Sequence, residues 1–254
     1  PCHSPVWDTA ISALALALDG ADRHGPALQK ARDWLLSKEV KATGDRKLKN
    51  PSPPSGWYFE FENEFYPDVD DTIMVMMALR QSSPRGADPR VDEALERGLT
   101  WVLGMQSADG GWASFDRDND KAFLAKIPFA DFNAVIDPST ADITSRVLEM
   151  FGLVFPERFG LSHPVVKRAL KFIQKDQCAD GSWYGRWGVN YLYGTWQVLR
   201  GLRLIGEDMT APWIRRAVGW LRSVQLPDGG WGERADTYEF PERKGKGPST
   251  ASQT

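Results

Sequence analysis

The chain has 254 residues, of which 42% are hydrophobic, and it carries a formal net charge of -3 at pH 7. Such a charge provides no broad basic surface, so composition argues against nucleic acid as a partner. Two cysteines, Cys2 and Cys178, are too few and too far apart for a disulfide framework or a zinc site, and no metal or cofactor is expected. There is no run of eighteen apolar residues and no visible signal peptide.

Aromatic residues are unusually abundant, with 11 Trp, 12 Phe and 6 Tyr. This abundance indicates a repeated motif or an aromatic cavity. The chain begins at Pro1 without a methionine and stops at Thr254 with no helix to close it. We therefore expect an internal fragment of a longer protein.

Two kinds of apolar segment alternate along the chain. One kind is centred on a threonine and is apolar on most faces. The other runs from a basic residue through an aromatic residue to Gln or Glu, and a Gly-Trp or Gly-x-Trp motif follows. In chain order they read WDTAISALALAL, KARDWLLSKE, DDTIMVMMAL, RGLTWVLGMQSADGGW, DITSRVLEMFG, RALKFIQKDQCADGSW, YGTWQVLRGL and RAVGWLRSVQLPDGGW.

Both kinds have helical periodicity, and Asp-Gly after the glutamine is a helix stop. The threonine segments should be buried inner helices, and the more charged segments should be outer helices. Alternating pairs of this type close into an α/α toroid or stack as a solenoid, and we favour an all-α, incomplete toroid of about four pairs. The Gln and Trp residues are interpreted as structural contacts between adjacent repeats.

Alignment of the inner helices on Thr9, Thr72, Thr144 and Thr195 gives one equivalent position two residues earlier. In a closed ring, these positions would meet at one mouth of a central cavity. Their side chains are two carboxyls, a phenol and an indole, from Trp7, Asp70, Asp142 and Tyr193.

The strongest local signal is PDVDDT, where Asp68, Asp70 and Asp71 crowd the start of a helix. Capping and the helix dipole explain one or two acids at such a site. Because three close carboxyls cannot all ionise freely, one should keep its proton above the usual pKa of about 3.9. The pattern therefore predicts a general acid for a very weak base.

Arg146 follows Asp142 by one helical turn and is the expected cation of the site, although an ordinary i,i+4 pair would also explain it. Tyr193 could pass a proton through its hydroxyl or could act as a cap. Aromatic faces stabilise cations by up to about 2 kcal/mol each. Aromatic residues expected near the same mouth, or in the long Trp112 to Asp137 connection, are Trp7, Phe59, Phe115, Phe129, Phe132 and Trp187.

These motifs resemble the squalene–hopene cyclases and, more distantly, the oxidosqualene cyclases. The resemblance covers essentially the whole chain. It rests on SPVWDT, GWYFEFENEFYPDVDDT, the Gln and Gly-x-Trp repeats, GRWGVNYLYGT and GKGPSTASQT.

The resemblance implies that Asp70 protonates a terminal alkene of squalene and that Asp68 and Asp71 support it. Tyr193 would belong to a reprotonation network, and Asp8 and Asp142 would be acids behind it. The cavity would be lined by Trp7, Phe59, Phe115 and Trp187, with Phe129 narrowing the channel to the substrate. The product would be hopene or hopanol, formed through carbocations, without any cofactor.

Three residues depart from the family pattern: Arg146 for histidine, Phe115 for tyrosine and Ala130 for cysteine. Arginine cannot lose its proton, so a histidine-type relay is excluded. The DVDDT motif indicates unoxidised squalene, because an epoxide needs a weaker acid. The resemblance further implies peripheral, monotopic attachment to the cytoplasmic side of the cell membrane, and it makes a homodimer an assembly to test.

Three alternatives remain open at this stage. An isoprenoid transferase subunit would need zinc, but His3, His24 and His163 are scattered and have no accompanying cysteine. DVDD could bind magnesium and diphosphate in an ionising terpene synthase, but no basic cluster lies near it. A helical-repeat binding module would explain the Gln and Trp residues without explaining DVDD and Arg146.

Overall fold

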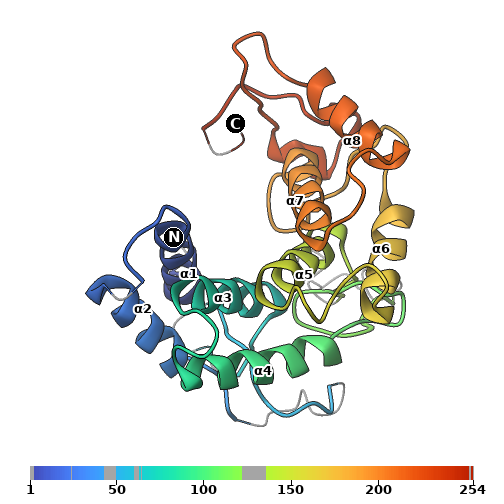
Figure 1. Cartoon of the computed structure of the whole chain (residues 1–254). Helices are drawn as coiled ribbons and strands as arrows, with labels where there is room; N and C mark the ends of the chain where they lie inside the picture. The colour runs from blue at the N-terminus through green and yellow to red at the C-terminus, as the bar shows by residue number, and fades with distance from the viewer. Residues whose placement is uncertain are drawn as a thin grey trace. The chain divides into compact units, whose positions relative to one another are not determined.

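The computed structural model describes residues 3–23, 25–42, 50–59, 63, 65–121, 136–251 and 253. Within these ranges every regular element is a helix, and extended segments meet only in single β-bridges (Figure 1). The α-helices are α1 (Pro5–Leu18), α2 (Pro26–Ser37), α3 (Val69–Ser82), α4 (Pro89–Gly104), α5 (Ala141–Val154), α6 (Pro164–Asp176), α7 (Asn190–Ile205) and α8 (Pro212–Ser223). Two short 3₁₀-helices follow, η4 (Ala235–Tyr238) and η5 (Pro241–Arg243).

The chain divides into two compact units. The N-terminal unit comprises Pro1–Ser107 and Ala113–Pro138, and it contains α1 to α4. The C-terminal unit comprises Ala108–Trp112 and Ser139–Thr254, and it contains α5 to α8. In each unit two inner helices pack together, α1 with α3 and α5 with α7, and each carries an outer partner. The predicted all-α class and the alternation of inner and outer helices are confirmed.

The inner and outer helices differ as their sequences indicate. Almost every residue of α5 is buried, whereas α6 buries only Val166, Ala169 and Ile173 along one stripe. Each outer helix begins with a proline: Pro26, Pro89, Pro164 or Pro212. Proline suits the first helical turn because its fixed φ is already helical and its missing N–H would have no helical partner there.

Two of the motif tryptophans, Trp57 and Trp183, each join an outer helix to the next inner helix. The indole N–H of Trp183 donates to the carbonyl of Ile173 near the end of α6, at 2.8 Å. Its backbone N–H donates to Oγ1 of Thr195 in α7, at 3.0 Å. Trp57 makes the same two bonds, to Leu35 and to Thr72. The repeated threonine is therefore the acceptor that binds α3, α5 and α7 to the preceding tryptophan.

The segment between glutamine and tryptophan is a tight turn. The carboxylate of Asp180 accepts from the backbone N–H of Ser182, two residues on, and Gly181 has a φ of 98°. Such a positive φ favours glycine. Gln177 donates to the carbonyl of Trp213 and accepts from Arg216, both in the next outer helix. The predicted contact between repeats is confirmed at this position.

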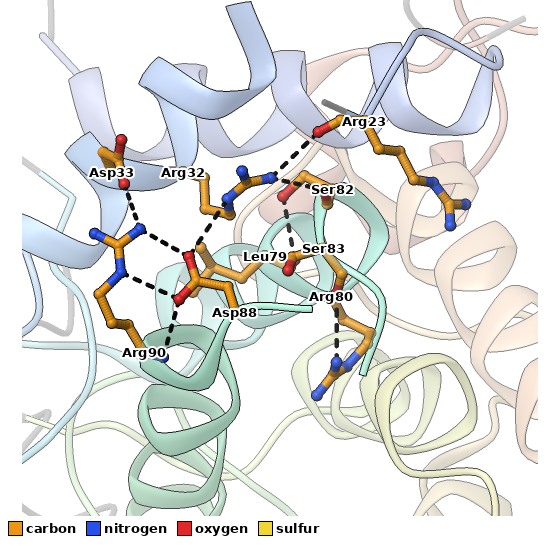
Figure 2. A network of polar contacts seen from close by, with 9 residues as sticks. All are labelled: Arg23, Arg32, Asp33, Leu79, Arg80, Ser82, Ser83, Asp88 and Arg90. Carbon is orange, nitrogen blue, oxygen red and sulfur yellow. Dashed lines mark hydrogen bonds and ion pairs between the residues drawn. The ribbon is translucent and has the colours of Figure 1, made fainter. Parts of the chain in front are cut away.

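The end of α3 is fixed by an ionic network between α2 and α4 (Figure 2). Arg32 of α2 donates to the carbonyl of Ser82 at 2.8 Å. Asp88 caps α4 and accepts from Arg90, which also donates to Asp33 of α2 at 2.8 Å. This network fixes the end of the helix opposite to the PDVDDT motif.

Helices α5 and α7 approach each other closely because small residues face each other. A Cβ placed on Gly201 would overlap the backbone carbonyl of Ser145, and one on Gly152 would overlap that of Leu204. Contacts advance in the same direction along both helices, so α5 and α7 run parallel. The absence of side chains at these two positions sets the distance between the helices.

We predict that Gly201→Ala destabilises the protein by about 1–3 kcal/mol, because the added methyl group forces two packed backbones apart. Urea denaturation of the full-length protein that contains this chain measures the change. Gly219→Ala in α8 is the matched control, since no atom lies within 4 Å of the added Cβ. The free energy of unfolding of this control should rise by up to about 1 kcal/mol, because alanine has a higher helix propensity than glycine. Equal effects of the two substitutions would contradict the packing argument.

Candidate functional site

The three acids of PDVDDT lie at the first turn of α3. Asp68 is the N-cap, and its carboxylate accepts from the backbone N–H of Asp71 at 2.8 Å. Asp68 and Asp71 are each only 3% exposed, whereas Asp70 is half-buried. Asp70 is therefore the acid of this cluster that is best able to contact another molecule.

The pKa of Asp68 is raised well above its ordinary value of 3.8. Burial is the main cause, and the negative charge of Asp71 and a hydrogen bond between the two carboxyl groups add to it. Burial and the neighbouring carboxylate thus favour the neutral form of Asp68, one of the two buried acids that flank the position of Asp70 in the first turn of α3.

Two extended segments bring aromatic residues to the start of α3. The backbone N–H of Asp68 donates to the carbonyl of Trp57 at 3.0 Å, next to Tyr58 and Phe59. The N–H of Val69 donates to the carbonyl of Ser114 at 2.8 Å, immediately before Phe115. Phe59 is half-buried and Phe115 is 39% exposed.

Helix α1 packs against α3 and carries Trp7, which is half-buried. The exposed Asp8 follows Trp7, and its carboxylate accepts from the hydroxyl of Ser4 at 3.1 Å. The N-terminal unit therefore gathers Trp7, Phe59, Phe115 and the three acids on elements that are bonded to, or packed against, α3.

A buried acid that the sequence did not single out fixes the loop before Phe115. Asp137 is 6% exposed and accepts from the backbone N–H groups of Phe115 and Asp116, at 2.5 and 2.9 Å. The signal for it is weak in the sequence, because its donors are backbone groups more than twenty residues away. Its position orders the segment that carries Phe115.

In the C-terminal unit, Asp142 lies in the first turn of α5 and is 1% exposed. Its carboxylate accepts from the hydroxyl of Thr140 and from the backbone N–H of Arg186, the latter at 2.8 Å. Asp142 thereby holds the loop that carries Trp187, whose ring is 52% exposed and lies 5.8 Å from the guanidinium of Arg186.

Arg146 reaches across from α5 to α7. Its Nη2 donates to the hydroxyl oxygen of Tyr193 at 2.9 Å and to Oε1 of Gln197 at 3.2 Å. The sequence predicted Asp142, one turn earlier, as its neighbour, but these hydrogen bonds direct Nη2 to the facing helix. Arg146 and Tyr193 are thus brought together, as a joint role in one site requires.

The start of α7 is held by a clamp that the sequence did not reveal. Buried Glu233 accepts from the backbone N–H groups of Asn190 and Leu192, at 3.3 and 2.7 Å. Gln253 donates to the carbonyl groups of Val189 and Glu233. The terminal GKGPSTASQT segment, part of the resemblance, thus supports the helix that carries Tyr193.

Phe129, Phe132 and Ala130 lie outside the described residues. Among the residues that are described, no group of three His, Cys, Asp or Glu side chains could hold a metal ion. None of the described helices is both long and apolar enough to cross a membrane.

Solved structures of terpene cyclases share the fold of this chain. A type II terpene cyclase from Scytonema matches 89% of this chain and 57% of its own, with a TM-score of 0.58 and 20% identity. An ent-copalyl diphosphate synthase from Streptomyces platensis matches 90% of this chain and 36% of its own, with a TM-score of 0.57 and 20% identity. At these identities the likeness shows the fold alone, which is that of the terpene cyclases.

The model of the squalene-hopene cyclase C-terminal domain matches residues 3–254. Squalene–hopene cyclases from Bradyrhizobium diazoefficiens and Alicyclobacillus acidocaldarius are each 44% identical to this chain, over 100% and 99% of its length. The chain belongs to the squalene–hopene cyclase family. It spans 39% of the length of both relatives.

We predict that Asp68→Asn reverses a pH-dependent loss of stability. Because the folded pKa of Asp68 is raised, the folded chain holds more protons than the unfolded chain at pH values above about 4. Stability from this group is present below that pH and is lost as pH rises through the folded pKa. Asparagine stays neutral and still caps α3. The free energy of unfolding of the variant should therefore rise relative to that of the wild type as the pH increases from 4 to 7.

Asp88→Asn is the matched control, because Asp88 also caps a helix but Arg90 lowers its pKa. The stability that Asp88 contributes is present above the unfolded pKa and is lost as pH falls. The free energy of unfolding of the asparagine variant should therefore fall below that of the wild type at higher pH. Urea denaturation at several pH values measures both differences. The same sign for both variants would show that capping, and not the retained proton, governs the effect.

Proposed function

We propose that this chain is the C-terminal part of a triterpene cyclase that protonates a terminal alkene of squalene and directs its cyclisation to hopene or hopanol. Family membership supports the reaction class. The observation that carries the proposal is the buried Asp68–Asp71 pair, in which burial and the charge of Asp71 raise the pKa of Asp68, in the same first turn of α3 as the half-buried Asp70.

The first step requires a strong acid in an apolar environment. Asp70 gives its proton to one carbon of the terminal double bond, whose π electrons form the new C–H bond and leave a tertiary carbocation. The raised pKa of Asp68 limits the negative charge near Asp70, and the N-terminus of α3 favours the carboxylate that remains. Both effects allow the acid to act and then to hold a charge.

The cation then migrates as successive double bonds of squalene attack it. Trp7, Phe59, Phe115 and Trp187 are proposed to present aromatic faces that stabilise the positive charge without offering a base. Phe129 and Phe132, which lie outside the described residues, are proposed for the same role. Loss of a proton at the end gives hopene, and addition of water gives hopanol. Tyr193 and Arg146 are proposed to belong to the network that reprotonates the acid, with Asp142 and Asp8 in supporting roles.

The apolar substrate points to the surroundings of the enzyme. The Scytonema terpene cyclase has a structure in complex with geranylgeranyl dihydroxybenzoate as substrate, so a relative in fold accepts a long isoprenoid chain. Squalene dissolves in membranes, and we propose that the full-length protein takes it up while bound peripherally to the cytoplasmic side of the cell membrane. A homodimer is proposed as its assembly.

We predict that Asp70→Asn in the full-length protein lowers the rate of squalene cyclisation by at least about a hundredfold, as expected when a general acid is removed. Gas chromatography of the products measures the rate. Asp92→Asn, in the first turn of α4, is the control and should retain turnover near that of the wild type. Unchanged cyclisation by the Asp70 variant would exclude the proposed function.

We predict that the 254-residue chain alone forms no cyclised product. It spans 39% of its relatives, and α1 exposes Ile11, Leu16 and Leu18 at 41%, 46% and 55%. Apolar side chains that are exposed together on one helix are expected to need a cover. Incubation of the purified chain with squalene, beside the full-length protein as positive control, tests this. Recovery of hopene from the chain would refute the prediction.

A further inference from the structure

A buried chain of polar side chains runs between α5 and α7, beginning at Tyr193. Arg146 donates to Gln197, and Gln197 Nε2 donates to Glu149 Oε2 at 3.0 Å. Arg200 Nε donates to the other oxygen of Glu149 at 2.6 Å. All five residues lie on two packed, parallel helices within the C-terminal unit. The sequence motifs indicate no role for Gln197 or Glu149.

These groups are buried more deeply than capping or solubility would require. Gln197 is 1% exposed, Glu149 3% and Arg146 5%, while the side chain of Arg200 is 44% exposed. Buried charges are costly unless they are paired and hydrogen-bonded, and apolar residues of similar size would pack these helices at least as well. A polar chain that ends on the hydroxyl of Tyr193 therefore calls for a role beyond packing.

The chemistry of each group fixes the direction of every hydrogen bond. An ionised carboxylate only accepts, so Glu149 forces Gln197 to present its NH₂ group to it. The carbonyl of the Gln197 amide must then face Arg146. A guanidinium only donates, and Nη2 has two hydrogens, one for Gln197 and one for Tyr193. The hydroxyl oxygen of Tyr193 is consequently an acceptor towards Arg146, and its own proton points elsewhere.

We propose that Gln197 and Glu149 are positioning residues that hold Arg146 against the Tyr193 hydroxyl, so that this hydroxyl can give its proton to a carboxylate. The inference rests on the proposed function. When the Tyr193 proton passes to that carboxylate, the electrons of the O–H bond stay on the phenolate oxygen. Arg146 stabilises that charge, and a hydronium ion from the solvent then returns a proton to Tyr193 and leaves as water.

Steady-state kinetics of the full-length protein with squalene test the proposal. Glu149→Gln and Gln197→Leu should each lower kcat by about tenfold, as expected when a charge-assisted hydrogen bond is lost, while KM stays unchanged. Glu39→Gln is the matched control for the first variant, because Glu39 is also buried and paired with an arginine, Arg97. Gln177→Leu is the control for the second, since Gln177 also accepts from an arginine. Both controls should keep the kcat of the wild type.

Two further variants separate positioning from a merely structural role. In a Tyr193→Phe background, the loss of kcat caused by Glu149→Gln should largely disappear, because the effect acts through the hydroxyl. The exchange Gln197→Glu with Glu149→Gln should restore kcat to near the wild-type value. In that double variant, the carboxylate at position 197 accepts from Arg146, and the amide at position 149 donates to it and accepts from Arg200. The exchange also conserves charge, so it keeps the test decisive where a single variant fails to fold.

Three results would overturn the proposal: equal kcat for Glu149→Gln and Glu39→Gln, a full loss in the Tyr193→Phe background, or no recovery in the exchange variant. Asp70→Asn in the same assay keeps the two hypotheses distinguishable. If it abolishes turnover while Glu149→Gln has no effect, only the positioning role is wrong. If Asp70→Asn leaves turnover intact, the proposed function itself fails.

Discussion

The arrangement of this protein depends on one repeated interaction, the pair of hydrogen bonds made by a tryptophan between two helices. In Trp183 the indole N–H caps the end of α6, and the backbone N–H binds Thr195 of α7. Trp112 makes the same backbone bond to Thr144 of α5 at 2.9 Å, and Trp57 makes it to Thr72 of α3. The residue two positions before each threonine is Tyr193, Asp142 or Asp70. Structural repetition thus places these three side chains at equivalent positions of their helices.

The buried carboxyl groups near these positions have two different roles. Asp142 and Glu233 accept backbone N–H groups, and so order the loop of Trp187 and the start of α7. Asp68 instead faces another acid, and burial beside Asp71 favours its neutral form. A carboxyl group that is surrounded by donors accepts hydrogen bonds and orders the backbone. A carboxyl group that is buried beside another acid has a raised pKa.

Much of the fold was predictable, because the period of apolar residues and the threonine and tryptophan motifs are local signals. The helix pairs, the burial of the inner helices and the grouping of acids at the start of α3 all followed from them. The hydrogen-bond donor to Thr195 could not be predicted, because neither propensity nor periodicity indicates which distant N–H this threonine accepts. Gln197 and Glu149 were missed for the same reason, although two charges, Arg146 and Glu149, interrupt the apolar run of α5. That interruption is the signal that indicates a buried polar network.

The central claim is that the DVDD cluster keeps a proton at neutral pH. Infrared difference spectroscopy of the full-length protein, wild type minus Asp68→Asn, tests it most directly, because a protonated carboxyl has a carbonyl stretching band that a carboxylate lacks. The account predicts such a band at pH 7 in the wild type, shifted in D₂O and lost in the variant. A wild-type spectrum that shows only ionised carboxylates for this cluster would contradict it.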